Sequence, residues 1–184
     1  MTSIEPAESD LVQAFRRIDE QRARDPEAVN LVAFRERLLG ELVGDADRVA
    51  AALAPGFTLV THAGGKTQTS SGDQVVSGVR RLGAVPGGAL MWLRLDDLVA
   101  DRTTIAGHGS LVTLAAAPTG GLHRTVAPLA FFIVSETTDA GSVMTSESLY
   151  LNPGAQETAV LADAALLDRQ RCLDLVGNLS RPAS

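Results

Sequence analysis

The chain has 184 residues, of which 45% are hydrophobic and 21% charged, and this composition is typical of a globular domain rather than of a disordered chain. Sixteen basic and 22 acidic residues give a net charge of −6, and the basic residues are scattered among acidic ones, which argues against a nucleic-acid partner. No stretch approaches the roughly 18 uncharged apolar residues of a membrane-spanning helix, so we expect no membrane contact.

The cysteine and histidine content bears on compartment and on metal binding. Cys172 is the single cysteine, so no internal disulfide can form and a reducing environment is expected. The N-terminal segment MTSIEPAESD is polar and acidic and lacks the apolar core of a signal peptide. Three histidines stand far apart, without the short spacing of metal ligands. The sequence therefore predicts a cytoplasmic protein that uses neither a metal nor another cofactor.

Helical periodicity occurs at both ends of the chain and in one short central segment. We expect residues 1–7 to be flexible, residues 8–176 to form a single domain, and residues 177–184 to form a flexible tail. Apolar residues three and four positions apart, bounded by Ser, Asp, Pro and Gly, predict the helices. Their expected ranges are 9–23, 27–43, 46–53, 71–82 and 155–176.

The region up to residue 151 also contains runs of another kind, rich in Val, Leu, Ile, Thr and Phe and ended by Gly, Pro and Asp. Such runs between turn residues are typical of consecutive antiparallel strands. The pattern predicts a short strand pair followed by four long strands. Their expected ranges are 57–61 and 67–69 for the pair, then 89–100, 103–116, 122–135 and 142–151.

This order of helices and strands predicts an α+β fold. The segment DADRVAAALAPGFTLVTH resembles the helix and first strand of the nuclear transport factor 2-like superfamily, and SSGDQVVSGVRRL resembles its short helix. The strands that end at SESLYL resemble the closing meander of that superfamily. The resemblance covers about residues 27–151 and implies a cone-shaped, curved antiparallel sheet with helices packed on its concave side. The helix over 155–176 is an addition to this core.

The resemblance implies a cavity rather than a particular reaction. The superfamily includes ketosteroid isomerase, limonene epoxide hydrolase, scytalone dehydratase and SnoaL-like polyketide cyclases, and most members are dimers through the open sheet face. On limonene epoxide hydrolase, His108 and Ser110 fall near an Arg-x-Asp pair and Glu147 falls near a second catalytic Asp. Two of these three positions differ, and the catalytic sets of ketosteroid isomerase and scytalone dehydratase are not matched either.

Two ionisable residues stand in otherwise apolar strand faces and are the candidate catalytic groups. His108 alternates with apolar residues of the strand over 103–116, and Glu147 with those of the strand over 142–151. Burial disfavours a charged carboxylate, so the pKa of Glu147 would rise toward the range of a general acid or base, and His108 could share its proton. Alternatively, His108 is a core or interface histidine and Glu147 faces solvent or a partner.

The expected ligand pocket is lined by strand residues and by the single tyrosine: Trp92, Ser110, Leu129, Phe131 and Tyr150. We expect a SnoaL-like enzyme of the cyclase, isomerase or dehydratase type, which acts on an apolar oxygenated substrate by general acid/base chemistry. The alternatives are a non-catalytic small-molecule-binding module and a dimeric assembly module of the same fold. The expected partners are a small apolar ligand or substrate and a second copy of the chain, bound through the sheet face.

Overall fold

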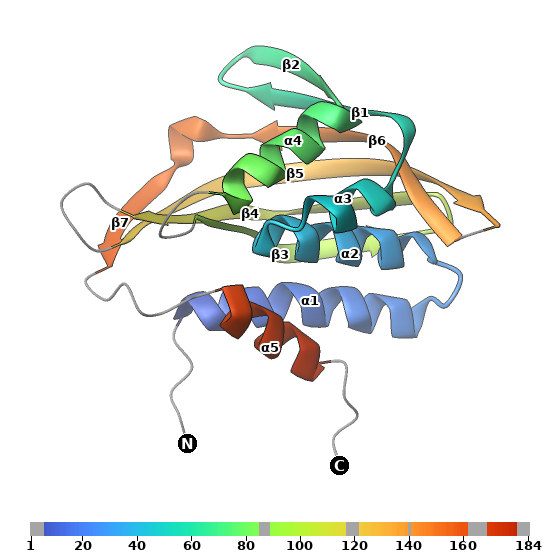
Figure 1. Ribbon diagram of the computed structural model, residues 1–184, viewed down its shortest axis with the longest axis horizontal. Coiled ribbons are helices and arrows are strands. Elements are labelled where there is room, and N and C mark those ends of the chain that lie inside the picture. Colours follow the sequence, from blue (N-terminus) through green and yellow to red (C-terminus); the bar gives the residue numbers. More distant parts are fainter. Residues whose placement is uncertain (1–5, 85–88, 117–121, 140, 162–168, 180–184) are drawn as a thin grey trace.

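The structure is a computed structural model that describes residues 6–84, 89–116, 122–139, 141–161 and 169–179 (Figure 1). The helices are α1 (Pro6–Arg24), α2 (Asn30–Val43), α3 (Ala46–Ala52), α4 (Gly72–Gly83) and α5 (Arg169–Leu179). The strands are β1 (Leu53–Ala63), β2 (Lys66–Ser71), β3 (Leu90–Ala100), β4 (Thr104–Ala116), β5 (Leu122–Thr138), β6 (Gly141–Leu151) and β7 (Glu157–Leu161). This succession confirms the predicted α+β class. Residues 1–5 and 180–184, where flexibility was predicted, lie outside the described residues.

The C-terminus of α2 and the N-termini of α3 and α4 have clear capping chemistry. α2 ends where Gly44 adopts a left-handed conformation with φ of 72°. Asp45 then accepts a hydrogen bond from the backbone N–H of Arg48 and so begins α3. α4 begins with a capping box, in which the side chains of Ser71 and Gln74 each bond to the other residue's backbone N–H.

The strands form one curved, open sheet with the order β2-β1-β6-β5-β4-β3, and β7 pairs with β5 (Figure 1). Neighbouring strands are antiparallel except β1 and β6, which are parallel. The edge at β3 is covered by α1, whose Gln13 donates a hydrogen bond of 2.7 Å to the carbonyl oxygen of Leu95. Covering an edge in this way removes it as a site of unwanted strand pairing.

The two faces of the sheet have different surroundings. α2 packs on the concave face, where the rings of Phe34 and Phe131 lie 5.4 Å apart, centroid to centroid. The opposite face is open in part: Phe132 and Tyr150 on it are 45% and 50% exposed, whereas Ser110 and Val112 on the same side are buried. Because successive strand residues point to opposite faces, Phe131 and Phe132 are neighbours in sequence but differ in burial. The predicted placement of helices on the concave side is confirmed.

The C-terminal segment differs from the helix predicted over residues 155–176. A short 3₁₀ helix, η1 (Pro153–Ala155), is followed by β7, and α5 begins only at Arg169. β7 pairs with Leu122–Val126 of β5, and so continues alongside β5 beyond the point where β6 stops. The apolar residues near 160 fit helical spacing, but the exposed hydrogen-bonding groups of the long strand β5 favour a strand there. Residues 162–168 of the predicted helix lie outside the described residues.

The break between β6 and β7 lies opposite Pro128. Proline has no backbone N–H to donate to a neighbouring strand. Its carbonyl oxygen still accepts a hydrogen bond of 3.0 Å from the N–H of Asn152. Beyond this break the chain reaches α5, which packs on α1 and α2 and places Cys172 in the core with no exposed surface. The added C-terminal helix is therefore part of the hydrophobic core.

Two glycines flank His108 because other groups approach β4 closely there. β3 carries a bulge between Leu95 and Asp97, where it pairs with this part of β4. A methyl group at Gly109 would overlap the backbone carbonyl of Arg94, and one at Gly107 would lie 2.7 Å from the ring of Phe131. The Gly-His-Gly sequence thus meets a packing requirement of the bulged sheet.

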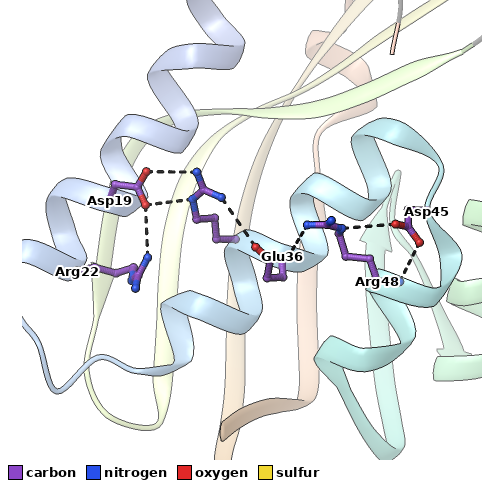
Figure 2. A network of polar contacts seen from close by, with 6 residues as sticks. Asp19, Arg22, Glu36, Asp45 and Arg48 are labelled. Atoms are coloured by element: carbon purple, nitrogen blue, oxygen red, sulfur yellow. Dashed lines mark hydrogen bonds and ion pairs between the residues drawn. The ribbon is translucent and has the colours of Figure 1, made fainter. Parts of the chain in front are cut away.

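A chain of ion pairs joins α1, α2 and α3 (Figure 2). Asp19 of α1 pairs with Arg35 of α2 at 3.1 Å, and Glu36 of α2 pairs with Arg48 of α3 at 2.5 Å. Arg48 also lies 3.5 Å from Asp45, the residue that caps its own helix. Partly exposed pairs of this kind stabilise a fold by only about 0–1 kcal/mol each, so the chain of pairs adds little to stability.

Candidate functional site

A cavity of about 390 Å³ lies between the concave face of the sheet, α2 and α4. Its volume is within the range of small-molecule sites, and most of its wall is apolar. Among the described residues, the wall consists of Arg37, Leu38, Glu41, Leu59, Ser70, Gln74, Val75, Gly78, Val79, Leu82, Met91, Leu93, Leu111, Leu129, Glu147 and Leu149. No described helix is long and apolar enough to cross a membrane.

Three charged residues are grouped on this wall. Nη1 of Arg37 lies 2.5 Å from Oε2 of Glu147, and Nε of Arg37 lies 2.9 Å from Oε1 of Glu41. The side chains of Arg37 and Glu147 are each 7% exposed, and that of Glu41 is 14% exposed. One guanidinium of α2 therefore holds two carboxylates, one from its own helix and one from β6.

The fold fixes both members of the buried pair. Glu147 lies on β6 between β1 and β5, in register with Leu59 and Ile133. Its partner Arg37 lies with its guanidinium carbon 5.6 Å from the centre of the Phe57 ring, a favourable cation–π position. The ion pair is thus held by the sheet on one side and by a packed helix on the other.

Burial and charge act in opposite directions on this cluster. Burial raises the pKa of Glu147, Arg37 lowers it and Glu41 raises it again, and the net effect is a pKa above the ordinary value of 4.5. Burial lowers the pKa of Arg37, but the two carboxylates outweigh that effect and raise it. The guanidinium therefore stays charged. The cluster carries a net charge of −1 with both carboxylates ionised, and it is neutral when one of them binds a proton.

His108 lies on the face of the sheet opposite to Glu147. The pairing of β4, β5 and β6 aligns Ile105, Ile133 and Glu147 in one row. His108 is three positions from Ile105 with no bulge of β4 against β5 between them, so its side chain points to the other face. It is exposed there. The expectation that His108 shares a proton with Glu147 is therefore wrong. Alternation within one strand cannot tell which of its faces the helices will cover.

Leu129 is the one predicted pocket residue that lines the cavity. Phe131 shares the concave face but packs against Phe34 of α2 instead of bordering the cavity. Trp92 is buried in the core, with 4% of its surface exposed. Trp92 stands between Met91 and Leu93, which line the cavity, so its side chain points to the other face of the sheet.

Ser110 and Tyr150 also lie away from the cavity. Ser110 is buried and accepts a hydrogen bond of 3.0 Å from Nη2 of Arg94. Tyr150 lies on the open face of the sheet, where its ring stacks on His62 at 4.5 Å between centroids. Ser110 is two positions from His108 on β4, and Tyr150 lies in the same row as His108, so both side chains point to the face opposite Glu147.

Arg37 and Glu41, the two residues of the site that come from α2, were not predicted from the sequence. Their signal is present in FRERLLGELV, where the pair is spaced i, i+4. Arg37 is also three residues after Phe34, which places a charged residue on the face of the helix that packs against the sheet. A charged residue on the buried face of a helix needs a partner, and this one has two.

The wall offers charged and apolar groups but no metal-binding set. Among the described residues, no group of three or more His, Cys, Asp or Glu side chains is arranged to hold a metal ion. The chemistry that the described wall itself supplies is proton transfer and charge pairing at the Arg37, Glu41 and Glu147 cluster.

Neither a family model nor a curated protein sequence matches the chain, but solved structures do. A candidate SnoaL-like polyketide cyclase from Shewanella denitrificans OS-217 has a TM-score of 0.52 at 5% identity, over 67% of this chain and 90% of its own. A candidate dehydratase of the NTF2-like family from Streptomyces avermitilis has a TM-score of 0.49 at 13% identity, over 73% of this chain and 95% of its own. At such identities the similarity concerns the fold alone. The chain has the nuclear transport factor 2-like fold that its sequence predicted.

Proposed function

We propose that this nuclear transport factor 2-like chain binds a small, largely apolar oxygenated molecule in its cavity, and that Glu147 moves a proton on that molecule. The observation that carries the proposal is a buried carboxyl group on the wall of an otherwise apolar cavity. Isomerisation, cyclisation and dehydration all need such a group, because each requires a proton to be taken from carbon or given to oxygen.

The surroundings of Glu147 support this role. Burial holds the pKa of its carboxyl group above the ordinary range, which makes it a better proton acceptor when ionised. Arg37 fixes its orientation through the ion pair. In an isomerisation the carboxylate takes a proton from one carbon and returns it to another atom of the same molecule, so no proton is consumed. His108 has no part in this proposal, since it lies on the other face of the sheet.

Ligand binding can be tested with the neutral, solvent-sensitive dye prodan and two glycine variants. Gly78 lines the cavity, and the nearest atom to a side chain added there is 3.9 Å away. We expect saturable, blue-shifted prodan fluorescence, weakened at least about tenfold in Gly78→Leu because the leucine fills the cavity. Gly177→Leu on α5 is the matched control, because no atom lies within 4 Å of a Cβ added at Gly177. This variant should bind prodan as tightly as the wild type. Equal binding by both variants would place the dye elsewhere and count against the cavity.

Proton transfer can be tested with β-tetralone, a small apolar ketone with acidic C–H bonds. We expect the protein to accelerate deuterium uptake from solvent into this ketone, as followed by NMR. Glu147→Gln should lower the protein-dependent rate about a hundredfold or more, the usual contribution of a general base. His108→Ala should leave the rate unchanged. If exchange is no faster than in buffer, or if Glu147→Gln keeps the full rate, the cavity binds without catalysis.

The non-catalytic alternative is favoured by the ion pair itself. A buried carboxylate that is already paired with an arginine can serve as a structural element, and in some proteins such pairs contribute to the uniqueness of the fold. In that case the cavity would be a small-molecule-binding module, and prodan binding would be seen without any deuterium uptake.

The cytoplasmic location stays a prediction from the sequence, which the single, buried Cys172 supports.

We also propose that the open sheet face joins two copies of the chain. Val99, Phe132 and Tyr150 on this face are 59%, 45% and 50% exposed, and exposed apolar patches often mark protein interfaces. Sedimentation should show a two-chain mass for the wild type and a one-chain mass for Phe132→Asp. Val32→Asp, at a position on α2 that is 44% exposed, should stay dimeric. A wild-type protein that sediments as a single chain at all concentrations would exclude this dimer.

A further inference from the structure

The charges on the cavity wall carry information about the ligand beyond its apolar character. We propose that the ligand of this cavity carries a cationic group, such as an ammonium, on an apolar body, and that the Arg37, Glu41 and Glu147 cluster receives it. This inference rests on the proposed small-molecule function, and it narrows the class of molecule that the cavity accepts.

The first support is the sum of charges. Arg37 contributes one positive charge, and Glu41 and Glu147 contribute two negative ones. The other polar residues that line the described wall, Ser70 and Gln74, are neutral. With both carboxylates ionised, the wall therefore carries one unbalanced negative charge. In a site that is mostly apolar such a charge acts over a longer range than in water and favours a positive ligand.

The second support is the count of donors and acceptors. Two carboxylates offer about eight acceptor positions, and a guanidinium has five N–H donors. Two of the donor nitrogens of Arg37 already face Glu41 and Glu147. Oε2 of Glu147 is buried and, although it lies at ion-pair distance from Arg37, it accepts no hydrogen bond of good geometry from the described residues. Oε2 of Glu147 is therefore a buried acceptor to which an N–H group of a cationic ligand could donate.

The third support is competition for Arg37. An anionic ligand would have to displace a resident carboxylate from the guanidinium, and it would leave that carboxylate buried without its partner. Unpaired buried charges are costly, so this exchange is unfavourable. A cationic ligand displaces nothing. With both carboxylates ionised, its positive charge balances the net charge of −1 of the cluster, and Glu147 stays in the ionised form that accepts protons.

Three compounds with one cyclohexyl body test the inference: cyclohexylmethylamine, which is a cation at neutral pH, cyclohexylmethanol, and cyclohexanecarboxylate. We expect the amine to bind about tenfold more tightly than the alcohol, as hydrogen bonds to charged groups usually allow, and the carboxylate to bind most weakly. Affinities are measured by isothermal titration calorimetry. The ratio of amine to alcohol affinity isolates the contribution of charge, because the apolar body is shared.

Variants of the two glutamates test whether the charged cluster causes the preference for the amine. Glu147→Gln and Glu41→Gln should each reduce the amine-to-alcohol ratio toward one, while the alcohol still binds and so shows that the cavity is folded. Glu136→Gln, at an exposed position of β5 outside the cavity wall, is the matched control and should keep the wild-type ratio. Glu41 is the more exposed of the two carboxylates, so its variant provides the test if Glu147→Gln does not fold.

The possible failures are distinguishable. Carboxylate binding as tight as amine binding, or an amine preference that survives both glutamate variants, would overturn the cationic ligand and leave the small-molecule function standing. If none of the three compounds binds, and prodan binding is also insensitive to Gly78→Leu, the small-molecule function fails and this inference fails with it.

Discussion

Glu147 occupies a position where a hydrophobic residue would pack without any cost in charge. It is on a central strand, it is buried, and its neighbours in the same row of the sheet are Leu59 and Ile133. The ion pair with Arg37 compensates for the lost hydration only in part, and the remaining cost raises the pKa of the carboxyl group. The raised pKa that makes Glu147 useful for proton transfer also makes the stability of the folded protein depend on pH.

The pH dependence has a definite sign. The folded protein holds a proton on Glu147 more tightly than the unfolded chain does, so the proton stabilises the folded state at acidic pH. That contribution should be lost as pH rises from 4.5, the ordinary value, through the raised pKa of the folded state. The loss is about 1.4 kcal/mol for each unit by which the pKa is raised. Urea unfolding across this range should show the loss in the wild type and in Glu136→Gln, and not in Glu147→Gln. A wild-type free energy of unfolding that rises relative to Glu147→Gln would reverse the sign and contradict the account.

Removal of Arg37 alone should destabilise the folded protein more than removal of both Arg37 and Glu147. Arg37→Met leaves Glu147 and Glu41 without their cation, and breaking a buried pair in this way typically costs about 3–5 kcal/mol. Arg37→Met combined with Glu147→Leu removes both buried charges and should recover most of that loss. Chemical denaturation of the two single variants and the double variant gives the coupling between the sites. Additive losses would show that Arg37 and Glu147 do not interact in the folded protein.

At the scale of elements, the bulge in β3 is the feature that depends most on one residue type. Gly109→Ala should destabilise the protein by about 2 kcal/mol or more, because the added methyl group meets the backbone carbonyl of Arg94 and the strand must move. Gly177→Ala, at a helical position of α5 with empty space around it, should instead stabilise it by about 0.5–1 kcal/mol. Thermal unfolding measures both. If Gly109→Ala is as stable as the wild type, β3 is not held as close to β4 as the structure shows.

The elements were predictable where local chemistry decides them. The helix that begins after Ser71 and the turn at Gly64 and Gly65 are encoded within a few residues, and the four long strands fall close to their predicted ranges. The segment near Val160 was not predictable in this way. Its apolar residues fit a helix, and only the presence of β5 beside it, a partner far away in sequence, makes it a strand. Local patterns cannot supply that information.

At the scale of the whole molecule, the candidate site also combines residues that local sequence identifies with residues that only the assembled fold brings together. Glu147 could be selected from sequence because it is an acid in an apolar strand. Its partner Arg37 could not, since only the packing of α2 on the sheet brings the two side chains together. His108 was selected for the same reason as Glu147, yet the pairing of three strands turns it to the open face. Which face of a sheet is covered is a property of the assembled fold, and no single strand encodes it.

The cavity also belongs to the whole molecule, because α2, α4 and strands from both halves of the sheet contribute to its wall. The measurement that tests the account most directly is a methyl NMR titration with cyclohexylmethanol, on protein labelled at leucine and valine. The account predicts saturable shifts for Leu111, Leu129 and Leu149 on the cavity wall, and none for Val99, which is exposed on the open face. Shifts confined to Val99 and its neighbours, or no shifts at all, would contradict it.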